Sequence, residues 1–239
     1  MSLDQVSFSI ILDTIKKFVD NKLIPREEEV SDTNKIPEDI IKEMQKLGLF
    51  GISIPNEYGG SNLSMEQEVM LTFELGRASP AFRSIAGTNI GIGSQAIVMS
   101  GTEKQKNKYL PKFATGELIG SFALTEPDSG SDAMSITTTA KKIGKKYIIN
   151  GTKRYITNAP IAGVFSVMAK TKPEKKSSSI SCFLVDANSP GLTIGKPDKK
   201  MGQRGALTSD VIFDNCEVKE DSLLGNKEGI GFTTAMKVL

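Results

Sequence analysis

The sequence predicts an α+β protein in which an N-terminal all-helical domain precedes an antiparallel β-barrel or β-sandwich domain. Apolar residues recur at three- and four-residue steps up to Gly116, whereas from Gly120 they form short segments that alternate every second residue. After Asn226 the spacing becomes helical again and continues to Leu239. We therefore expect three units: a helical domain at 1–117, a β-domain at 118–225 and the start of a truncated C-terminal helical domain at 226–239.

The composition narrows the classes of function. Of the 239 residues, 38% are hydrophobic and 24% are charged, which is typical of a globular chain with a buried core, and the net charge of +2 gives no reason to expect a nucleic-acid partner. Histidine is absent, so we exclude histidine-based catalysis and expect no metal site. The two cysteines carry no paired spacing, which argues against a disulfide framework. Without a leader or an apolar run of ~18 residues, we expect a cytoplasmic protein with no membrane span.

Two amphipathic helices are expected at the start of the chain. The first covers 3–20, where apolar residues recur at helical spacing, and it ends at Pro25 and the charged run 26–29. The second begins at Pro37, a favourable first-turn residue, and ends at Gly48.

Two later helices begin with a capping-box pattern. Ser64 is followed three residues later by Gln67, and Thr102 is followed by Gln105. The second of these helices is expected to end near Gly116. In the helix after Ser64 we expect one apolar stripe to pack in the core: Met65, Val69 and Phe73.

Residues 91–96 fit the glycine pattern of a dinucleotide-binding loop, but their context differs from that of such a loop. No strand precedes them, and Glu117, the acidic residue at a suitable distance, follows a helix rather than a second strand. Close packing between helices explains Gly91 and Gly93 better than a nicotinamide site does.

After a first strand at 122–124, the β-domain is expected to continue with a hairpin around Gly144 that joins 136–140 to 146–150. Asn150 and Gly151 form a tight-turn signal before the next strand. Turns that contain proline or glycine separate further short strands, which we expect at 164–169, 180–185, 192–194 and 211–213. Strands of this length and spacing favour an antiparallel barrel or sandwich.

Two segments of the β-domain carry the groups of a candidate ligand site. The apolar strand 122–124 runs into a polar turn with the hydroxyls of Thr125 and Ser131. Such a turn offers hydroxyl and backbone N–H groups to phosphate or carbonyl oxygens. Downstream, Tyr155 and Thr157 lie two residues apart on one face of a strand, and a ring beside a hydroxyl suits a planar heteroaromatic ligand. The alternative is an ordinary β-domain loop with a structural tyrosine.

The same two segments resemble those of a known family. Residues 123–135 meet each specified position of the signature of the acyl-CoA dehydrogenase family: Ala123, Leu124, Thr125, Glu126, Ser129, Gly130, Ser131, Asp132 and Ser135. Residues 155–158 resemble that family's second flavin-contacting segment, and the resemblance covers nearly the whole chain. It implies an N-terminal helical domain and a middle β-domain, followed by the opening turns of the family's C-terminal helical bundle.

The resemblance also implies a cofactor and its ligands. FAD would bind against the middle domain, with its flavin, ribityl and phosphate groups lined by Phe122, Leu124, Thr125 and Ser131. Tyr155 and Thr157 would lie at the isoalloxazine ring, with Thr157 near the N5 edge. Ser131 would also lie close to the acyl-CoA substrate. Most members carry tryptophan where Tyr155 stands, so ring stacking is retained here and the indole N–H is not.

The reaction implied by the resemblance is α,β-dehydrogenation of an acyl-CoA thioester, with hydride transfer to flavin N5. The family's catalytic carboxylate lies in the C-terminal bundle, so we expect the base beyond Leu239 and assign no catalytic residue to this chain. Glu126 is expected to have a structural hydrogen-bonding role. The chain would then be a truncated or split dehydrogenase, inactive alone.

Partners follow from the same resemblance. They are an electron-transfer flavoprotein, a separate polypeptide with the C-terminal domain, and further copies of this chain in a homo-oligomer. Two alternatives stay open: a non-catalytic module that binds acyl-CoA or flavin, and a related acyl-CoA oxidase or flavin monooxygenase. Acyl chain length cannot be read from this sequence.

Overall fold

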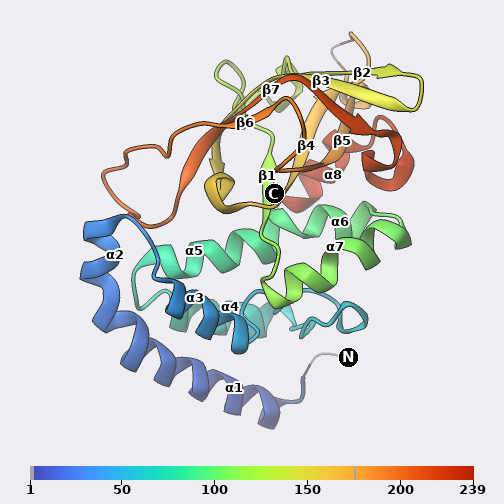
Figure 1. Cartoon of the computed structure of the whole chain (residues 1–239). Helices are drawn as coiled ribbons and strands as arrows, with labels where there is room; N and C mark the ends of the chain where they lie inside the picture. Colours follow the sequence, from blue (N-terminus) through green and yellow to red (C-terminus); the bar gives the residue numbers. More distant parts are fainter. Residues whose placement is uncertain (1–2, 175) are drawn as a thin grey trace.

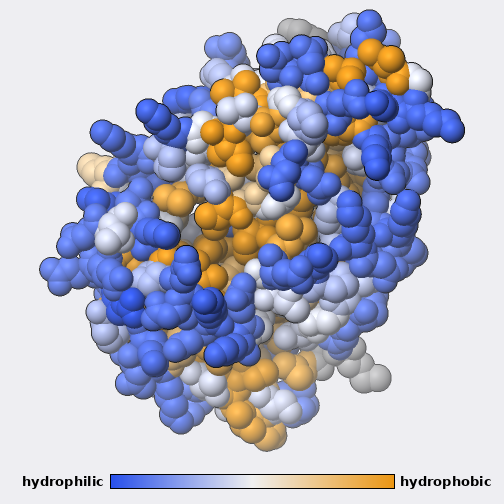
Figure 2. Space-filling model, viewed as in Figure 1, coloured by the Kyte–Doolittle hydropathy of each residue, from blue (hydrophilic) through white to orange (hydrophobic). Residues whose placement is uncertain are grey.

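The computed structural model describes residues 3–174 and 176–239. It has a helical layer on one side and a curled β-sheet on the other, and the last helix lies between them beside α6 (Figure 1). No helix in the described residues is long and apolar enough to cross a membrane. Hydrophobic residues gather across the middle of the face in Figure 2, and hydrophilic residues surround them.

The helices of the N-terminal layer begin at the capping signals that the sequence contains. Ser64 and Thr102 both form complete capping boxes with Gln67 and Gln105, and Pro37 is the N-cap residue of its helix. The seven α-helices are α1 Gln5–Phe18, α2 Glu27–Thr33, α3 Glu38–Lys46, α4 Met65–Leu75, α5 Pro80–Thr88, α6 Gln95–Ser100 and α7 Glu103–Thr115.

The charged run after α1 begins a helix instead of ending one. A π-helical turn, Val19–Leu23, and a 3₁₀ turn that contains Pro25 follow α1, and α2 then begins at Glu27. The prediction that this run only terminates a helix was therefore wrong. Three glutamates in the first turn of α2 are favourable next to the positive end of its dipole, which explains why the chain becomes helical again there.

The prediction for the apolar stripe of α4 was also wrong. The side chains of Met65 and Phe73 are each 75% exposed, and Val69 is 44% exposed. Leu71 and Leu75 are the buried residues of this helix. Both faces of α4 contain apolar residues, so periodicity alone did not show which face packs against the rest of the helical layer.

The β-domain is one mixed seven-stranded sheet. Its strand order is β1-β4-β2-β3-β7-β6, and β5 pairs with β4. The bounds are β1 Gly120–Ala123, β2 Thr139–Ile143, β3 Lys146–Thr157, β4 Val164–Lys170, β5 Ile180–Asp186, β6 Leu192–Ile194 and β7 Thr208–Lys219. The helical domain followed by a β-domain agrees with the predicted class. The pairing is not wholly antiparallel, however, because β1 and β2 both run parallel to β4.

The hairpin around Gly144 is present, but the tight turn expected at Asn150 and Gly151 is absent, and β3 runs straight through it. The register between β3 and β7 shifts there, so the pair forms a bulge. Gly151 has a φ of +147°, and a Cβ atom on it would come within 2.4 Å of the Thr138 hydroxyl. Glycine is therefore needed here because β3 passes close to the segment before β2, and not because the chain turns.

Buried amide side chains join the helical layer to the sheet. The Asn89 amide donates to the carbonyls of Phe50 and Phe113 and accepts the N–H of Gly120, where β1 begins. The Asn158 amide at the end of β3 donates to the carbonyl of Ile85 in α5. The two layers therefore share hydrogen bonds as well as a hydrophobic core.

Of the two glycines in the dinucleotide-like motif, Gly93 serves packing, whereas a Cβ atom on Gly91 would meet no atom of the described residues within 4 Å. A Cβ atom on Gly93 would come within 3.0 Å of the Gly120 carbonyl oxygen, so the chain after α5 can approach β1 closely only with glycine there. This confirms a packing role for Gly93, although its neighbour is a strand rather than another helix, and the packing role expected for Gly91 was wrong.

A final helix, α8 Gly231–Val238, packs beside α6. The Thr234 and Ser100 hydroxyls are 2.9 Å apart and share a hydrogen bond across this contact.

Candidate functional site

The two segments that carry the predicted ligand groups lie side by side. The backbone N–H of Arg154 in β3 donates to the Thr125 carbonyl oxygen at 2.8 Å. The Ser121 hydroxyl in β1 donates to the Thr157 carbonyl oxygen at 2.6 Å. The turn after β1 and the second half of β3 are thus fixed next to each other.

The turn after β1 is closed by its own hydrogen bonds. Glu126 and Ser129 exchange backbone hydrogen bonds, and the Ser129 hydroxyl donates to the Asp132 carbonyl oxygen at 2.6 Å. Among the described residues, no acceptor is found for the backbone N–H groups of Gly130 and Ser131. The Ser131 side chain is exposed. A turn with free N–H groups and an accessible hydroxyl suits phosphate or carbonyl oxygens.

Tyr155 has an unusual backbone conformation in β3. Its φ is +57°, a left-handed value that is rare for a bulky residue, and it falls where the register with β7 shifts between Lys153 and Ile156. The bulge breaks the alternation of the strand: Lys153 is fully buried, whereas the Tyr155 side chain is 60% exposed. Strain of this kind is typical of functional positions.

A cation lies over the Tyr155 ring. The Arg154 guanidinium carbon is 4.7 Å from the ring centroid, and the guanidinium donates to the Asp210 carboxylate at 2.7 Å. The stack covers one side of the ring and fixes its orientation. Thr157, two residues further on, is half-buried. An oriented, accessible ring can bind a flat aromatic group.

The structure buries two of the predicted site residues beneath the polar turn and β3. Phe122 and Leu124 are each 7% exposed and belong to the hydrophobic core shared by the helices and the sheet. Thr125 is half-buried. The turn and the strand therefore present Thr125, Ser131, Tyr155 and Thr157 to solvent to different degrees, whereas Phe122 and Leu124 support them from below.

A buried ion pair that the sequence analysis missed lies next to these groups. The Lys153 ammonium donates to the Glu126 carboxylate at 2.8 Å, and both side chains are almost completely buried. The sequence held a signal for this: Tyr147, Ile149, Gly151 and Lys153 occupy alternate positions of one strand, so the lysine follows the inward face.

The charge states of this pair follow from its surroundings. Burial would raise the pKa of Glu126, but the attraction of Lys153 and hydrogen bonds from Thr137 and Thr138 outweigh it and lower that pKa to about 2. Burial lowers the pKa of Lys153 to about 8, although Glu126 opposes the shift. The pair is thus ionic at neutral pH, and Glu126 is a poor proton acceptor.

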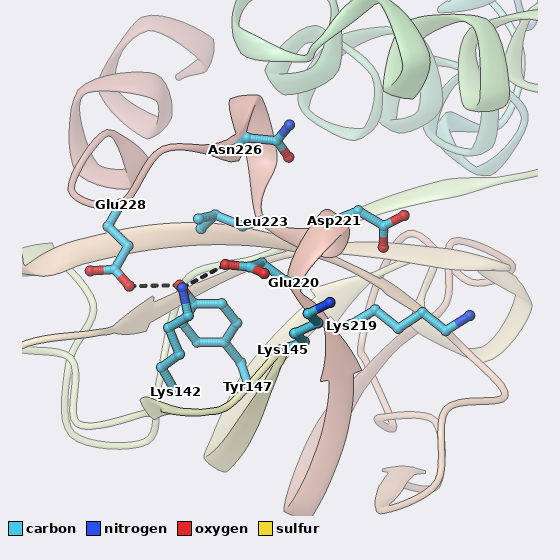
Figure 3. Close-up of a pocket in the computed structure, with 9 residues that line it drawn as sticks. All are labelled: Lys142, Lys145, Tyr147, Lys219, Glu220, Asp221, Leu223, Asn226 and Glu228. Atoms are coloured by element: carbon cyan, nitrogen blue, oxygen red, sulfur yellow. Dashed lines mark hydrogen bonds and ion pairs between the residues drawn. The ribbon is translucent and has the colours of Figure 1, made fainter.

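Two hollows open elsewhere on the β-domain. One, of about 590 Å³, follows the polar turn; its described lining includes Lys141, Lys170 and Lys172 with hydroxyl side chains and no acidic residue. The other, of about 640 Å³, lies at the hairpin end of β3, where lysines and acidic residues mix (Figure 3). There the Tyr147 hydroxyl donates to Glu228 and Lys142 pairs with Glu220.

In the described part of the chain, no acidic or cysteine side chains cluster as a metal site requires.

Comparison with known proteins gives consistent results. Residues 8–117 match the family model "Acyl-CoA dehydrogenase, N-terminal domain", and residues 121–216 match "Acyl-CoA dehydrogenase, middle domain". An acyl-CoA dehydrogenase of Bacillus subtilis (strain 168) is 42% identical over 222 residues, which are 93% of this chain and 58% of the relative. This chain therefore spans less than two thirds of the relative's length.

Two solved structures have the same fold. An acyl-CoA dehydrogenase complexed with FAD from Bacillus anthracis has a TM-score of 0.89 and 35% identity, covering 98% of this chain and 40% of that one. A chain from the study of the electron transferring flavoprotein of Acidaminococcus fermentans, which concerns flavin-based electron bifurcation, has a TM-score of 0.93 and 36% identity. That match covers 100% of this chain and 62% of the other.

Proposed function

Because this chain belongs to the acyl-CoA dehydrogenase family, we propose that it forms the FAD- and acyl-CoA-binding part of an acyl-CoA dehydrogenase. One observation carries the proposal: the free N–H groups of the polar turn and the accessible ring of Tyr155 belong to segments that are hydrogen-bonded to each other. Phosphate or carbonyl oxygens and a flat heteroaromatic ring are what such a pair of segments can hold together.

The residues have separate roles in this proposal. The Thr125 and Ser131 hydroxyls and the N–H groups of Gly130 and Ser131 would hold polar groups of FAD. Tyr155 would contact the isoalloxazine ring, and Thr157 would donate a hydrogen bond near its N5 edge. Phe122 and Leu124, being buried, would act by supporting the turn and through their backbone groups.

FAD, when bound, supplies the acceptor for a hydride from the β-carbon of the acyl-CoA. The proposed reaction also requires a carboxylate to remove the α-proton. Glu126 does not fit that role, because its carboxylate is buried and holds Lys153, Thr137 and Thr138. We therefore expect the 239-residue chain alone to bind both ligands without turning over.

The lysine-lined hollow next to the polar turn supports an acyl-CoA ligand. Its lining includes Ser135, which is four residues after Ser131. Three lysines line it as well, and its described lining contains no acidic residue. Phosphate groups favour such a site. We propose that the nucleotide end of coenzyme A binds there, while Ser131 lies nearer the thioester.

This placement predicts the effect of charge removal. Replacing Lys141 and Lys170 together by glutamine should weaken coenzyme A binding about tenfold or more at low salt and less at high salt, because screened charges contribute less. Isothermal titration calorimetry at two ionic strengths measures the dissociation constant for coenzyme A. Lys145→Gln, in the mixed-charge hollow of Figure 3, is the control and should change nothing. Equal effects of both variants would contradict the placement.

The proposal for FAD is tested by titrating the purified chain with FAD and following flavin fluorescence and absorbance. Saturable binding that Tyr155→Ala weakens is the expected result. The other three tyrosines, Tyr58, Tyr109 and Tyr147, are all buried, so Tyr58→Phe serves as the aromatic control. Absence of binding by the wild-type chain would overturn the proposal. Reduction of a dye by acyl-CoA and FAD without a second polypeptide would overturn the expectation that the chain alone is inactive.

Partners are proposed on the same basis. The structural likeness to a chain from the study of an electron transferring flavoprotein supports an electron-transfer flavoprotein as the electron acceptor. The exposed apolar residues of α4 support association with further protein, either a C-terminal-domain polypeptide or a second copy of this chain.

A further inference from the structure

A buried ion pair ties together the two segments of the proposed flavin site. We propose that Glu126 and Lys153 are positioning residues, which hold the polar turn and the second half of β3 at the separation that FAD requires before FAD binds. This inference rests on the proposed function. It concerns two buried side chains that would act through the residues next to them.

The Glu126 carboxylate joins three segments of the chain. One oxygen accepts from the Lys153 ammonium at 2.8 Å and from the Thr138 N–H at 3.0 Å. The other accepts from the Thr137 N–H at 2.5 Å and from its hydroxyl at 2.8 Å. Lys153 also donates to the Leu124 carbonyl oxygen at 3.0 Å. The turn, the segment before β2 and the middle of β3 therefore meet at one carboxylate.

The neighbours of this pair are the proposed ligand groups. Glu126 directly follows Thr125, and Lys153 is two residues before Tyr155. Between them, the Arg154 N–H donates to the Thr125 carbonyl oxygen. A change in how Glu126 and Lys153 meet would therefore shift the segments that carry Thr125 and Tyr155 relative to each other.

Stability alone does not explain why two charges are buried here. The Lys153 side chain is 0% exposed and that of Glu126 is 3% exposed, so both have lost their hydration. Replacing a buried ion pair by apolar residues of the same volume often leaves stability unchanged or raises it, because desolvation offsets the attraction. What the charges add is direction: four donor groups fix the orientation of one carboxylate, and apolar contacts would not.

The test separates stability from position. The variants are Glu126→Gln, Lys153→Met and the double variant, which removes both charges at once. The control is Lys146→Met, which removes an exposed ion pair with Glu217 from the same strand. For each folded apo-protein, thermal unfolding gives stability, fluorescence titration gives the dissociation constant for FAD, and the absorption spectrum reports the surroundings of the flavin.

We expect each single variant to lose stability, since each leaves one buried charge without its partner. The double variant should recover stability but still bind FAD about tenfold or more weaker than wild type, with an altered flavin spectrum, since the bonds from Lys153 are gone and the glutamine amide offers one acceptor oxygen where the carboxylate offered two. Lys146→Met should match wild type in all three measurements.

Two results would overturn the inference. If the double variant binds FAD as tightly as wild type, the pair has only a structural role, and the proposed function stands. If the wild-type chain binds no FAD, the proposed function fails and the inference fails with it. The double variant keeps the test decisive even where a single variant does not fold.

Discussion

At the scale of single residues, the protein buries two opposite charges, those of Glu126 and Lys153, next to each other. Glu126 accepts hydrogen bonds from Lys153, Thr137 and Thr138, and it stays ionised because these donors outweigh the cost of burial. The carboxylate is therefore a fixed structural anion rather than a base. Because the pKa of Glu126 is lowered in the folded protein, the protein should lose stability as the pH falls.

Acid should destabilise the protein through Glu126. Its pKa is about 2 in the folded protein and near 4.5 ordinarily, so its stabilisation is fully present above the ordinary value and is lost as the pH falls toward 2. The contribution is ~3 kcal/mol. Urea unfolding from pH 6 to pH 2.5 measures it. The Glu126→Gln, Lys153→Met double variant should lose less stability over this range, and an equal loss would contradict the assignment.

The two cysteines are free and buried, in β5 and β7. Burial raises the pKa of Cys182 to about 12 and that of Cys216 to about 11, so neither forms the reactive thiolate at neutral pH. We expect no reaction of the native protein with a disulfide reagent at pH 8, and reaction of both thiols in denaturant. A thiol that reacts in the native protein within the mixing time would contradict this.

At the scale of elements, α4 has two apolar faces, of which one is buried and the other is exposed. Leu71 and Leu75 face the core, whereas Met65 and Phe73 lie exposed. Leu71→Ala should cost ~2–5 kcal/mol of unfolding free energy, since it leaves a cavity. Phe73→Ala should stay within ~0.5 kcal/mol, as is usual for an exposed residue. Chemical denaturation of dilute protein compares the two, and a large effect of Phe73→Ala would show that this face is covered in solution.

The sheet shows how one residue redirects an element. Gly151 allows β3 to continue through a bulge, where the sequence signal at Asn150 predicted a turn. The continuous strand carries Lys153 inward and, within the second irregularity, Tyr155 outward. The bulges thus decide which side chains of β3 face the ion pair and which face the proposed ligand.

At the scale of the whole molecule, the helical layer and the sheet are coupled through buried amides. Asn89 is fully buried and makes three hydrogen bonds, to Phe50, Phe113 and Gly120. The contact fixes where β1 leaves the helical layer. Since β1 leads directly into the polar turn, the helices help to position the site.

Removing the Asn89 amide should destabilise both layers together. Asn89→Ala leaves two carbonyls and one N–H without their partner, and we expect a loss of ~3 kcal/mol or more. Asn107→Ala is the matched control, because Asn107 is exposed and makes a single bond within α7; it should stay within ~0.5 kcal/mol. Urea unfolding followed by circular dichroism compares them. Similar midpoints for the two variants would contradict the role of Asn89.

The sequence by itself determined the features that depend on neighbours in the chain. The capping residues Ser64 and Thr102 fixed where two helices begin, the change of period at Gly120 separated helices from strands, and the signature turn marked the candidate site. These features rest on interactions between residues three or four apart, or on alternation within one strand, and such interactions can be read from a single sequence.

Only the tertiary structure decided which apolar face of α4 is buried, that β1 pairs in parallel with β4, and that Lys153 meets Glu126. Each depends on a contact between distant segments; the ion pair joins residues 27 positions apart. Local periodicity shows that a side chain can be buried, but not which partner it meets. Burial of a charge is favourable only once that partner is in place.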